Sequence, residues 1–108
     1  MIKFIDNEKQ NLIREYIPDR ATLLSLANFF SLLGDGTRIK LLSALSISPM
    51  CVSDMAKILN MNQTTISHQL KTMRENGFID FERKGKMLIY YIKENKILDI
   101  MLKAVDMI

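Results

Sequence analysis

The sequence has little of what marks several classes of protein. Its 108 residues include one cysteine, two prolines and no tryptophan. The single thiol, Cys51, cannot form an intrachain disulfide, and alone it supplies only one of the roughly four ligands of a structural zinc site. The longest apolar run, Leu23 to Leu33, contains three polar residues and is far shorter than the roughly 20 residues that cross a bilayer. We therefore expect no disulfide, no cofactor and no membrane span.

The start of the chain and its overall composition favour a cytoplasmic protein. Asp6 and Glu8 fall within the first ten residues, which lack the apolar core and small-residue cleavage site of a signal peptide. The length fits one domain over residues 1–108, and 48% hydrophobic with 25% charged residues is typical of a folded chain. A net charge of +3 permits a polyanionic partner without requiring one.

Apolar residues recur at helical spacing through the first half of the chain. The pattern predicts helices over residues 6–17, 19–33 and 35–46. The predicted caps are Asp6, Asp19 and Asp35. Gly34 ends the second helix and Pro49 prevents continuation of the third. The second helix has so broad an apolar face that we expect it to be deeply buried.

Two short helices follow, separated by only a few residues. Ser53 is the predicted cap of the first, which ends at Asn60, and the second covers residues 64–75 and ends near Gly77. This spacing is that of a helix-turn-helix unit, whose second helix can lie in the major groove of DNA.

The period of the apolar residues then changes from about 3.6 to 2, which predicts a β-hairpin. Its strands cover residues 79–82 and 87–92, and its tip, residues 83–86, carries three cations and a turn-forming Gly85. A last helix, residues 97–108, has an apolar stripe. The fold class is therefore mainly α with a small β-hairpin: a winged helix-turn-helix with an added helix at each end.

Candidate DNA contacts gather on the second helix of the unit and on the hairpin. Between Met61 and Tyr90 there are five cations and three anions. Short polar residues at the start of a helix can meet base edges and phosphates, and Asn and Gln can pair with adenine. The predicted contacts are Asn62, Gln63, Thr64, Thr65, Ser67, His68, Lys71, Arg74, Arg83, Lys84 and Lys86. Alternatives stay open: a solvated charged surface, Asn62 or Thr64 as a helix cap only, and His68 as an ordinary packed or solvated residue.

Residues 26–102 resemble the arsenic- and zinc-responsive repressors of the ArsR/SmtB family. The similarity includes Leu33-Gly34-Asp35-Gly36-Thr37-Arg38 and the Leu-rich helix after it. Its most specific part is Thr65-Ile66-Ser67-His68-Gln69-Leu70-Lys71-Thr72-Met73-Arg74-Glu75-Asn76-Gly77, which is similar to the family's recognition helix with its Ser-His-x-Leu. The hairpin contributes Arg83-Lys84-Gly85-Lys86 and the pair Tyr90-Tyr91.

The resemblance implies a homodimeric repressor of a pseudo-palindromic operator in double-stranded DNA, with the two terminal helices as the dimer interface. The residues agree, because the apolar faces of residues 6–17 and 97–108 would otherwise be exposed patches. The predicted interface residues are Leu12, Ile13, Tyr16, Ile97, Ile100, Met101, Ala104, Val105 and Ile108. The alternative is that the last helix folds back on its own domain.

The metal sites common in this family are changed here. Its Leu-Cys-Val-Cys-Asp-Leu segment corresponds to Met50-Cys51-Val52-Ser53-Asp54-Met55, which keeps one of two thiols. Lys96 and Met107 stand about where the last helix would carry histidines. We predict no metal ligands; an unconventional metal site stays open. Cys51 is either a small buried apolar residue or a thiol switch near a helix amino terminus.

Two other classes of function compete with a DNA-binding repressor. An interaction module could keep the fold and pair with another regulator without binding DNA. An enzyme is disfavoured, because the chain has one histidine, one cysteine and no glycine-rich phosphate loop or recognisable carboxylate pair. A dyad of Cys51 and His68 is conceivable, but each residue has a simpler structural role.

Overall fold

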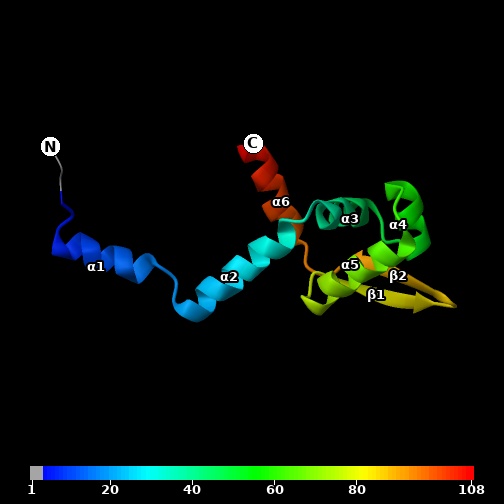
Figure 1. Ribbon diagram of the computed structural model, residues 1–108, viewed down its shortest axis with the longest axis horizontal. Coiled ribbons are helices and arrows are strands. Elements are labelled where there is room, and N and C mark those ends of the chain that lie inside the picture. The colour runs from blue at the N-terminus through cyan, green and yellow to red at the C-terminus, as the bar shows by residue number, and fades with distance from the viewer. Residues whose placement is uncertain (1–3) are drawn as a thin grey trace. The chain divides into compact units, whose positions relative to one another are not determined.

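The computed structural model describes residues 4–108, which divide into two compact units at the step from Ser31 to Leu32 (Figure 1). Within the described residues, the elements follow one another as six helices with a hairpin before the last. They are α1 (Asn7–Tyr16), α2 (Arg20–Leu33), α3 (Gly36–Ile47), α4 (Val52–Leu59), α5 (Gln63–Glu75), β1 (Ile79–Lys84), β2 (Met87–Ile92) and α6 (Lys96–Met107). The predicted winged helix-turn-helix order is confirmed, with boundaries that differ by one or a few residues.

Three predicted aspartate caps are present. Asp6 accepts a hydrogen bond from the backbone N–H of Lys9 at 2.8 Å, and Asp19 accepts one from Thr22 at 2.8 Å. Asp35 likewise accepts from the backbone N–H of Arg38 at 3.0 Å. Each bond satisfies a donor that a helix start leaves without a partner. The hydrogen bonds from Thr22 also hold the pKa of Asp19 below its ordinary value.

The prediction that α2 is deeply buried is wrong. No residue of α2 is buried, and its Leu24 and Phe30 side chains are 58% and 59% exposed. The spacing of apolar residues shows that a helix has an apolar face, but it does not show whether the same chain covers that face. In the single chain, the apolar face of α2 is exposed to solvent.

The hydrophobic core lies in the second unit. Helices α3, α4 and α5 pack on one another and on the hairpin, and seven large side chains there are shielded from solvent. These are Leu41, Leu42, Met55, Ile66, Leu70, Met73 and Ile79. Burying an aliphatic side chain of this size contributes about 1.5–3 kcal/mol, so this cluster accounts for much of the unit's stability.

The helix-turn-helix unit differs from the prediction at its first cap. Helix α4 begins after Cys51, whose side chain caps no backbone N–H, and not after Ser53, which lies inside the helix. A serine within a turn of the start gives the same local pattern as a capping serine, which explains the error. The helix ends as predicted at Asn60, which has a left-handed backbone with φ of 52°.

The hairpin is a regular antiparallel pair. Its register joins Ile79 to Ile92 at one end and Lys84 to Met87 at the other. The turn is therefore only Gly85 and Lys86, so the predicted four-residue tip is wrong: the β1 strand continues through Lys84. Gly85 has a φ of 63°, and Lys86 does not share a positive φ. This is the pattern of a type II′ turn, which needs glycine at its first position.

A short bridge that the sequence did not reveal ties the hairpin to the loop before α4. The backbone N–H of Met50 donates to Tyr90 at 3.1 Å, and the N–H of Tyr90 donates to Met50 at 3.0 Å. One residue on each side is too short for a periodic pattern. The bridge fixes β2 against the helix-turn-helix unit.

The last helix, α6, contributes one buried residue, Ile97. It lies beside α3, and the two helices border a mainly apolar groove of about 220 Å³. The groove is lined by Ser43, Ser46, Leu98, Met101, Leu102 and Val105. Among residues 4–108, no helix is long and apolar enough to cross a membrane.

Candidate nucleic-acid interface

Helix α5 presents two opposite faces. Ile66, Leu70 and Met73 are buried in the core, which fixes the rotation of the helix about its axis. The predicted DNA contacts on the helix therefore point to solvent. These exposed residues are Gln63, Thr64, Thr65, Ser67, His68, Lys71 and Arg74. An exposed polar face on a helix held by its apolar face has the form needed to enter the major groove.

Asn62 is the cap of α5. Its side-chain oxygen accepts a hydrogen bond from the backbone N–H of Thr65 at 3.1 Å. Of the two alternatives, Asn62 and Thr64, the cap is thus Asn62, while Thr64 lies inside the helix and is exposed. Capping uses the side-chain oxygen of Asn62, and the residue is exposed.

A hydrogen bond that the sequence reasoning missed anchors α5 to the start of α3. The Nε of Arg38 donates to the side-chain oxygen of Gln69 at 2.7 Å, and another of its nitrogens donates to the carbonyl of Leu32 at 3.3 Å. Arg38 ends the Leu-Gly-Asp-Gly-Thr-Arg motif, and Gln69 lies within the recognition-helix segment. The motif at residues 33–38 and the recognition-helix segment, which both carry the family resemblance, are therefore in contact. Their distance in the sequence gives no sign of this contact.

The hairpin carries three exposed cations beside α5. Arg83 and Lys84 end β1, and Lys86 lies in the turn. None of the three forms an ion pair with another residue among those that the structure describes. Since β1 packs against α5, these cations and the polar face of the helix belong to the same compact unit (Figure 1).

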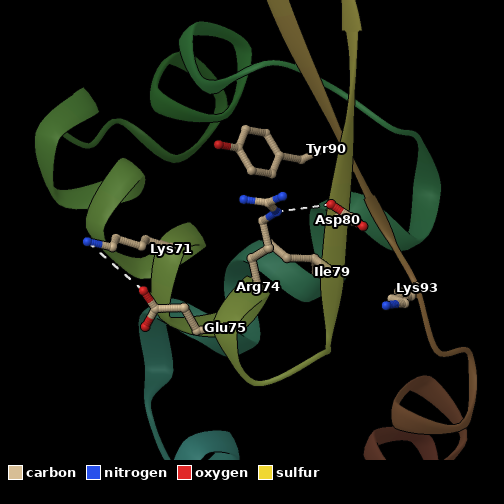
Figure 2. Close-up of a pocket in the computed structure, with 7 residues that line it drawn as sticks. All are labelled: Lys71, Arg74, Glu75, Ile79, Asp80, Tyr90 and Lys93. Carbon is tan, nitrogen blue, oxygen red and sulfur yellow. Dashed lines mark hydrogen bonds and ion pairs between the residues drawn. The ribbon is translucent and has the colours of Figure 1, made fainter.

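The cations near the end of α5 are partly engaged within the chain. The Lys71 ammonium lies 4.0 Å from the Glu75 carboxylate, one turn further along the exposed helix surface. The Nε of Arg74 donates to Asp80 at 3.0 Å, and its guanidinium lies 4.0 Å from the centre of the Phe81 ring. Figure 2 shows Arg74 reaching from α5 toward β1. Lys71 and Arg74 thus differ. Lys71 forms only a long ion pair with Glu75, whereas Arg74 is hydrogen-bonded to Asp80 and stacked on Phe81.

An open hollow of about 500 Å³ lies between the end of α5 and the hairpin (Figure 2). Its lining mixes Lys71, Arg74 and Lys93 with Glu75 and Asp80. The hydrogen bond from Arg74, followed by one from the Phe81 N–H, holds the pKa of the Asp80 carboxyl below its ordinary value. Asp80 therefore stays ionised beside these cations.

Comparison with known proteins identifies the family. The family described as "Bacterial regulatory protein, arsR family" matches residues 35–80, which include α3, α4 and α5. The chain belongs to the arsR family.

A transcriptional repressor SmtB homolog from Synechocystis is 31% identical over 75% of this chain and 61% of its own length. The cadmium resistance transcriptional regulatory protein CadC from Listeria innocua is 37% identical over 71% of this chain and 66% of its own. The chain thus spans slightly under two thirds of these relatives.

A solved structure shows the same fold. The homodimeric winged helix-turn-helix DNA-binding domain of Mb0332 from Mycobacterium bovis, a possible ArsR-family transcriptional regulator, is similar with a TM-score of 0.70. It is 27% identical, and the match covers 84% of this chain and 88% of that one.

The segment that corresponds to a family metal site keeps one thiol in this arsR-family chain. Cys51 is only 7% exposed, and its Sγ lies 3.2 Å from the Oγ of Ser53, within hydrogen-bond reach. A thiophilic ion needs several soft donors, whereas residues 50–55 offer one thiol, and Ser53 stands where the family has its second. No group of three or more His, Cys, Asp or Glu side chains placed to hold a metal occurs within residues 4–108.

The predicted interface residues of the terminal helices are mostly exposed. On α1, Leu12 and Ile13 are about half exposed and Tyr16 is 80% exposed. On α6, Val105 is 66% exposed and Ile108 lies fully in solvent. Ile97 differs, because it is 3% exposed and already packs within its own unit. It therefore serves the core of the single chain and does not present its side chain to a partner.

Proposed function

We propose that this arsR-family protein is a sequence-specific transcriptional repressor that binds double-stranded operator DNA as a homodimer. The observation that carries the proposal is the solvent-facing polar side of α5 in the same compact unit as three exposed hairpin cations. The names of the two relatives support it, since they describe a transcriptional repressor and a transcriptional regulatory protein.

The proposed contacts divide into two kinds. Gln63, Thr64, Thr65, Ser67 and His68 lie on the exposed side of the first turns of α5, where they would meet base edges and give sequence preference. Lys71 and the hairpin cations Arg83, Lys84 and Lys86 would meet phosphates or the adjacent minor groove and supply most of the salt-dependent affinity. Asn62 would both cap the helix and lie next to the DNA.

The proposed dimer rests on the exposed apolar residues of α1 and α6. A second copy would cover the stripe of Ile100, Met101, Ala104, Val105 and Ile108, together with Leu12, Ile13 and Tyr16 of α1. Apolar patches of this kind on a small chain mark an interaction surface, and a two-fold partner buries the same patch on both copies. In this proposal the chain acts as one DNA-binding domain with terminal dimerisation helices, and the operator is pseudo-palindromic.

Selection of bound fragments from a genomic DNA pool, followed by mobility-shift assays with excess nonspecific competitor, tests the proposal. We expect a competitor-resistant complex on an inverted repeat. Loss of every complex in competitor would contradict DNA recognition and would favour an interaction module that keeps the fold. A bound site without repeat symmetry would contradict the dimeric arrangement.

The thiol switch at Cys51 stays a prediction, and the same assay tests it. The affinity of the wild type and of Cys51→Ser for the selected site is measured with and without peroxide, persulfide and divalent metals. A sensor at Cys51 predicts that oxidant or metal weakens only the wild type. Equal affinity under all conditions in both proteins would contradict it. The proposed repressor would act in the cytoplasm, where it meets its DNA.

A further inference from the structure

Arg74 holds the end of α5 to the hairpin through two contacts on one side chain. Its Nε donates to the Oδ1 of Asp80 at 3.0 Å, and its guanidinium lies 4.0 Å from the Phe81 ring centre. An arginine can satisfy both partners because it has donors along its edge and a flat cationic face. Helix and strand are thereby joined across the side of the hollow shown in Figure 2.

The two partners of Arg74 are themselves fixed. The Oδ1 of Asp80 also accepts a hydrogen bond from the Phe81 backbone N–H at 2.8 Å, which orients the carboxylate. The Phe81 ring meets the Tyr90 ring edge to face, with 5.5 Å between centroids. Phe81 and Tyr90 are paired residues of β1 and β2. The side chain of Arg74 is therefore coupled to both strands of the hairpin.

This network continues into the helix-turn-helix unit. Tyr90 exchanges two backbone hydrogen bonds with Met50, in the loop that precedes α4. The end of α5, the hairpin and that loop are thus joined by consecutive interactions. Such a network links the position of the hairpin, which carries Arg83, Lys84 and Lys86, to that of α5.

The exposure of the pair indicates what it can contribute. The side chains of Arg74 and Asp80 are 49% and 34% exposed, and ion pairs this accessible add little to global stability. What they can do is select one orientation of two elements that are already folded. Because the Asp80 carboxylate already pairs with Arg74, a phosphate bound at the same guanidinium would lie close to a second negative charge that repels it.

Resting on the DNA-binding function proposed above, we propose that Arg74 is a positioning residue that sets the hairpin against α5 so that both reach DNA together. It acts through Asp80 and Phe81 and contacts no phosphate. This assignment replaces the direct DNA contact expected for Arg74 from the sequence, and it leaves Lys71, Arg83, Lys84 and Lys86 as the phosphate-binding cations.

The charge-neutral double variant Arg74→Ala/Asp80→Asn tests the assignment by fluorescence anisotropy on the selected operator at several salt concentrations. Positioning predicts that the affinity falls by roughly two- to fivefold, the scale of an exposed ion pair, with an unchanged salt slope. Asp80→Asn alone should also weaken binding, although it removes a negative charge next to the DNA. If Arg74 contacts a phosphate, the slope falls by about 0.9 and Asp80→Asn strengthens binding or leaves it unchanged.

A matched control removes the other pair in the same hollow. Lys71→Ala/Glu75→Gln also preserves net charge, but it removes a cation that we place on a phosphate. It should therefore lower the salt slope by about 0.9, unlike the variant at Arg74 and Asp80. Equal slopes for both double variants would overturn the distinction between a positioning and a contacting cation.

A second measurement needs no DNA. Backbone ¹⁵N relaxation of the free protein should show greater motion at Gly85 and Lys86 in Arg74→Ala/Asp80→Asn than in the wild type, with α5 unchanged. An unchanged hairpin would overturn the positioning role even if DNA binding is confirmed. Failure of the wild-type protein to retain any DNA in competitor would instead overturn the proposed function, so the two failures are distinguishable.

Discussion

Helices α5 and α6 are nearly equal in length but expose opposite kinds of residue. Helix α5 buries Ile66, Leu70 and Met73 and presents polar and cationic side chains to solvent. Helix α6 buries Ile97 alone and leaves large apolar side chains such as Val105 in solvent. The difference points to two kinds of partner, a polyanion for the first and an apolar surface for the second.

The largest expected effect concerns α6, the helix that exposes apolar side chains. Val105→Glu would place a charge in the proposed dimer interface, where an unpaired buried charge costs several kcal/mol. We expect dimer affinity to fall by at least about 100-fold, measured by analytical ultracentrifugation, and operator affinity to fall with it. Because Val105 is 66% exposed in the single chain, each protomer should stay folded by circular dichroism.

Lys103→Glu is the control for that variant, since Lys103 is an exposed polar residue of the same helix. It should leave the dimer intact. Equal dissociation of both variants would show only a general sensitivity of α6 to acidic residues. Unchanged association of Val105→Glu would contradict the assignment of this face to the dimer.

The next effect concerns the hairpin cations. Replacing Arg83, Lys84 and Lys86 with alanine should weaken binding to all DNA sequences alike and lower the salt slope by up to about 2.7, or about 0.9 for each phosphate that a cation no longer neutralises. Anisotropy titrations over a range of salt concentrations measure the slope. The variant Lys9→Ala/Lys40→Ala/Lys103→Ala changes the net charge equally, but its three residues lie outside the proposed DNA-binding surface. A similar slope in both triple variants would place the DNA-binding cations elsewhere.

Removing a single polar side chain from α5 should change selectivity. For Gln63→Ala we expect discrimination at one base pair per half-site to fall by about 1–3 kcal/mol, the usual scale for a good bidentate contact. The salt slope should stay the same. Repeating the DNA selection with the variant measures the change, and an unaltered consensus would remove Gln63 from the base-reading set.

Asn62 allows the cap and the DNA contact to be separated. Asn62→Ala should lower the free energy of unfolding by about 1 kcal/mol, because the Thr65 N–H no longer has its side-chain acceptor. Asn62→Ser keeps a capping oxygen and should recover most of that stability in denaturant titrations. If Asn62→Ser then binds DNA as well as the wild type, the role of Asn62 is capping alone.

The smallest effect is that of acid on Asp80. Its pKa is lowered from the ordinary 3.8, so the ion pair with Arg74 contributes its full stability above pH 3.8 and this contribution disappears as the pH falls through the lowered value. The wild type should therefore be slightly more stable than Asp80→Asn at pH 6, and the difference in thermal midpoint should shrink below pH 3.8. Glu82→Gln, on the same strand, is the control. A difference that does not change with pH would contradict an ionised Asp80 as its source.

The fold is largely predictable from the sequence because its signals are local. Asp6, Asp19 and Asp35 are recognisable as caps, and the change of period locates the hairpin. Prediction fails where the answer depends on residues far apart in the sequence. The fold alone brings together the Arg38–Gln69 hydrogen bond, the Met50–Tyr90 bridge and the partners of Arg74. Whether the apolar face of α2 is buried likewise depends on segments outside that helix. Ser53 fails for a different reason, since two neighbouring positions give the same capping pattern.

The candidate site likewise has local features that the sequence predicts and long-range contacts that it does not. Exposure of the polar face of α5 follows from helical spacing, because Ile66, Leu70 and Met73 had to face the core. Arg74 carries no sequence signal that distinguishes it from Lys71, since both are cations in the last turns of one helix. Only the position of Asp80 and Phe81 on the adjacent strand separates a positioning cation from a contacting one.

The contrast between α5 and α6 is tested most directly by mapping amide chemical-shift changes in the ¹⁵N-labelled protein as the selected duplex is added. If α5 and the hairpin bind DNA as proposed, the largest changes should fall at Gln63–His68 and Arg83–Lys86, with α6 nearly unaffected. Changes concentrated on α6, or an α5 face that does not respond at saturation, would contradict this proposal.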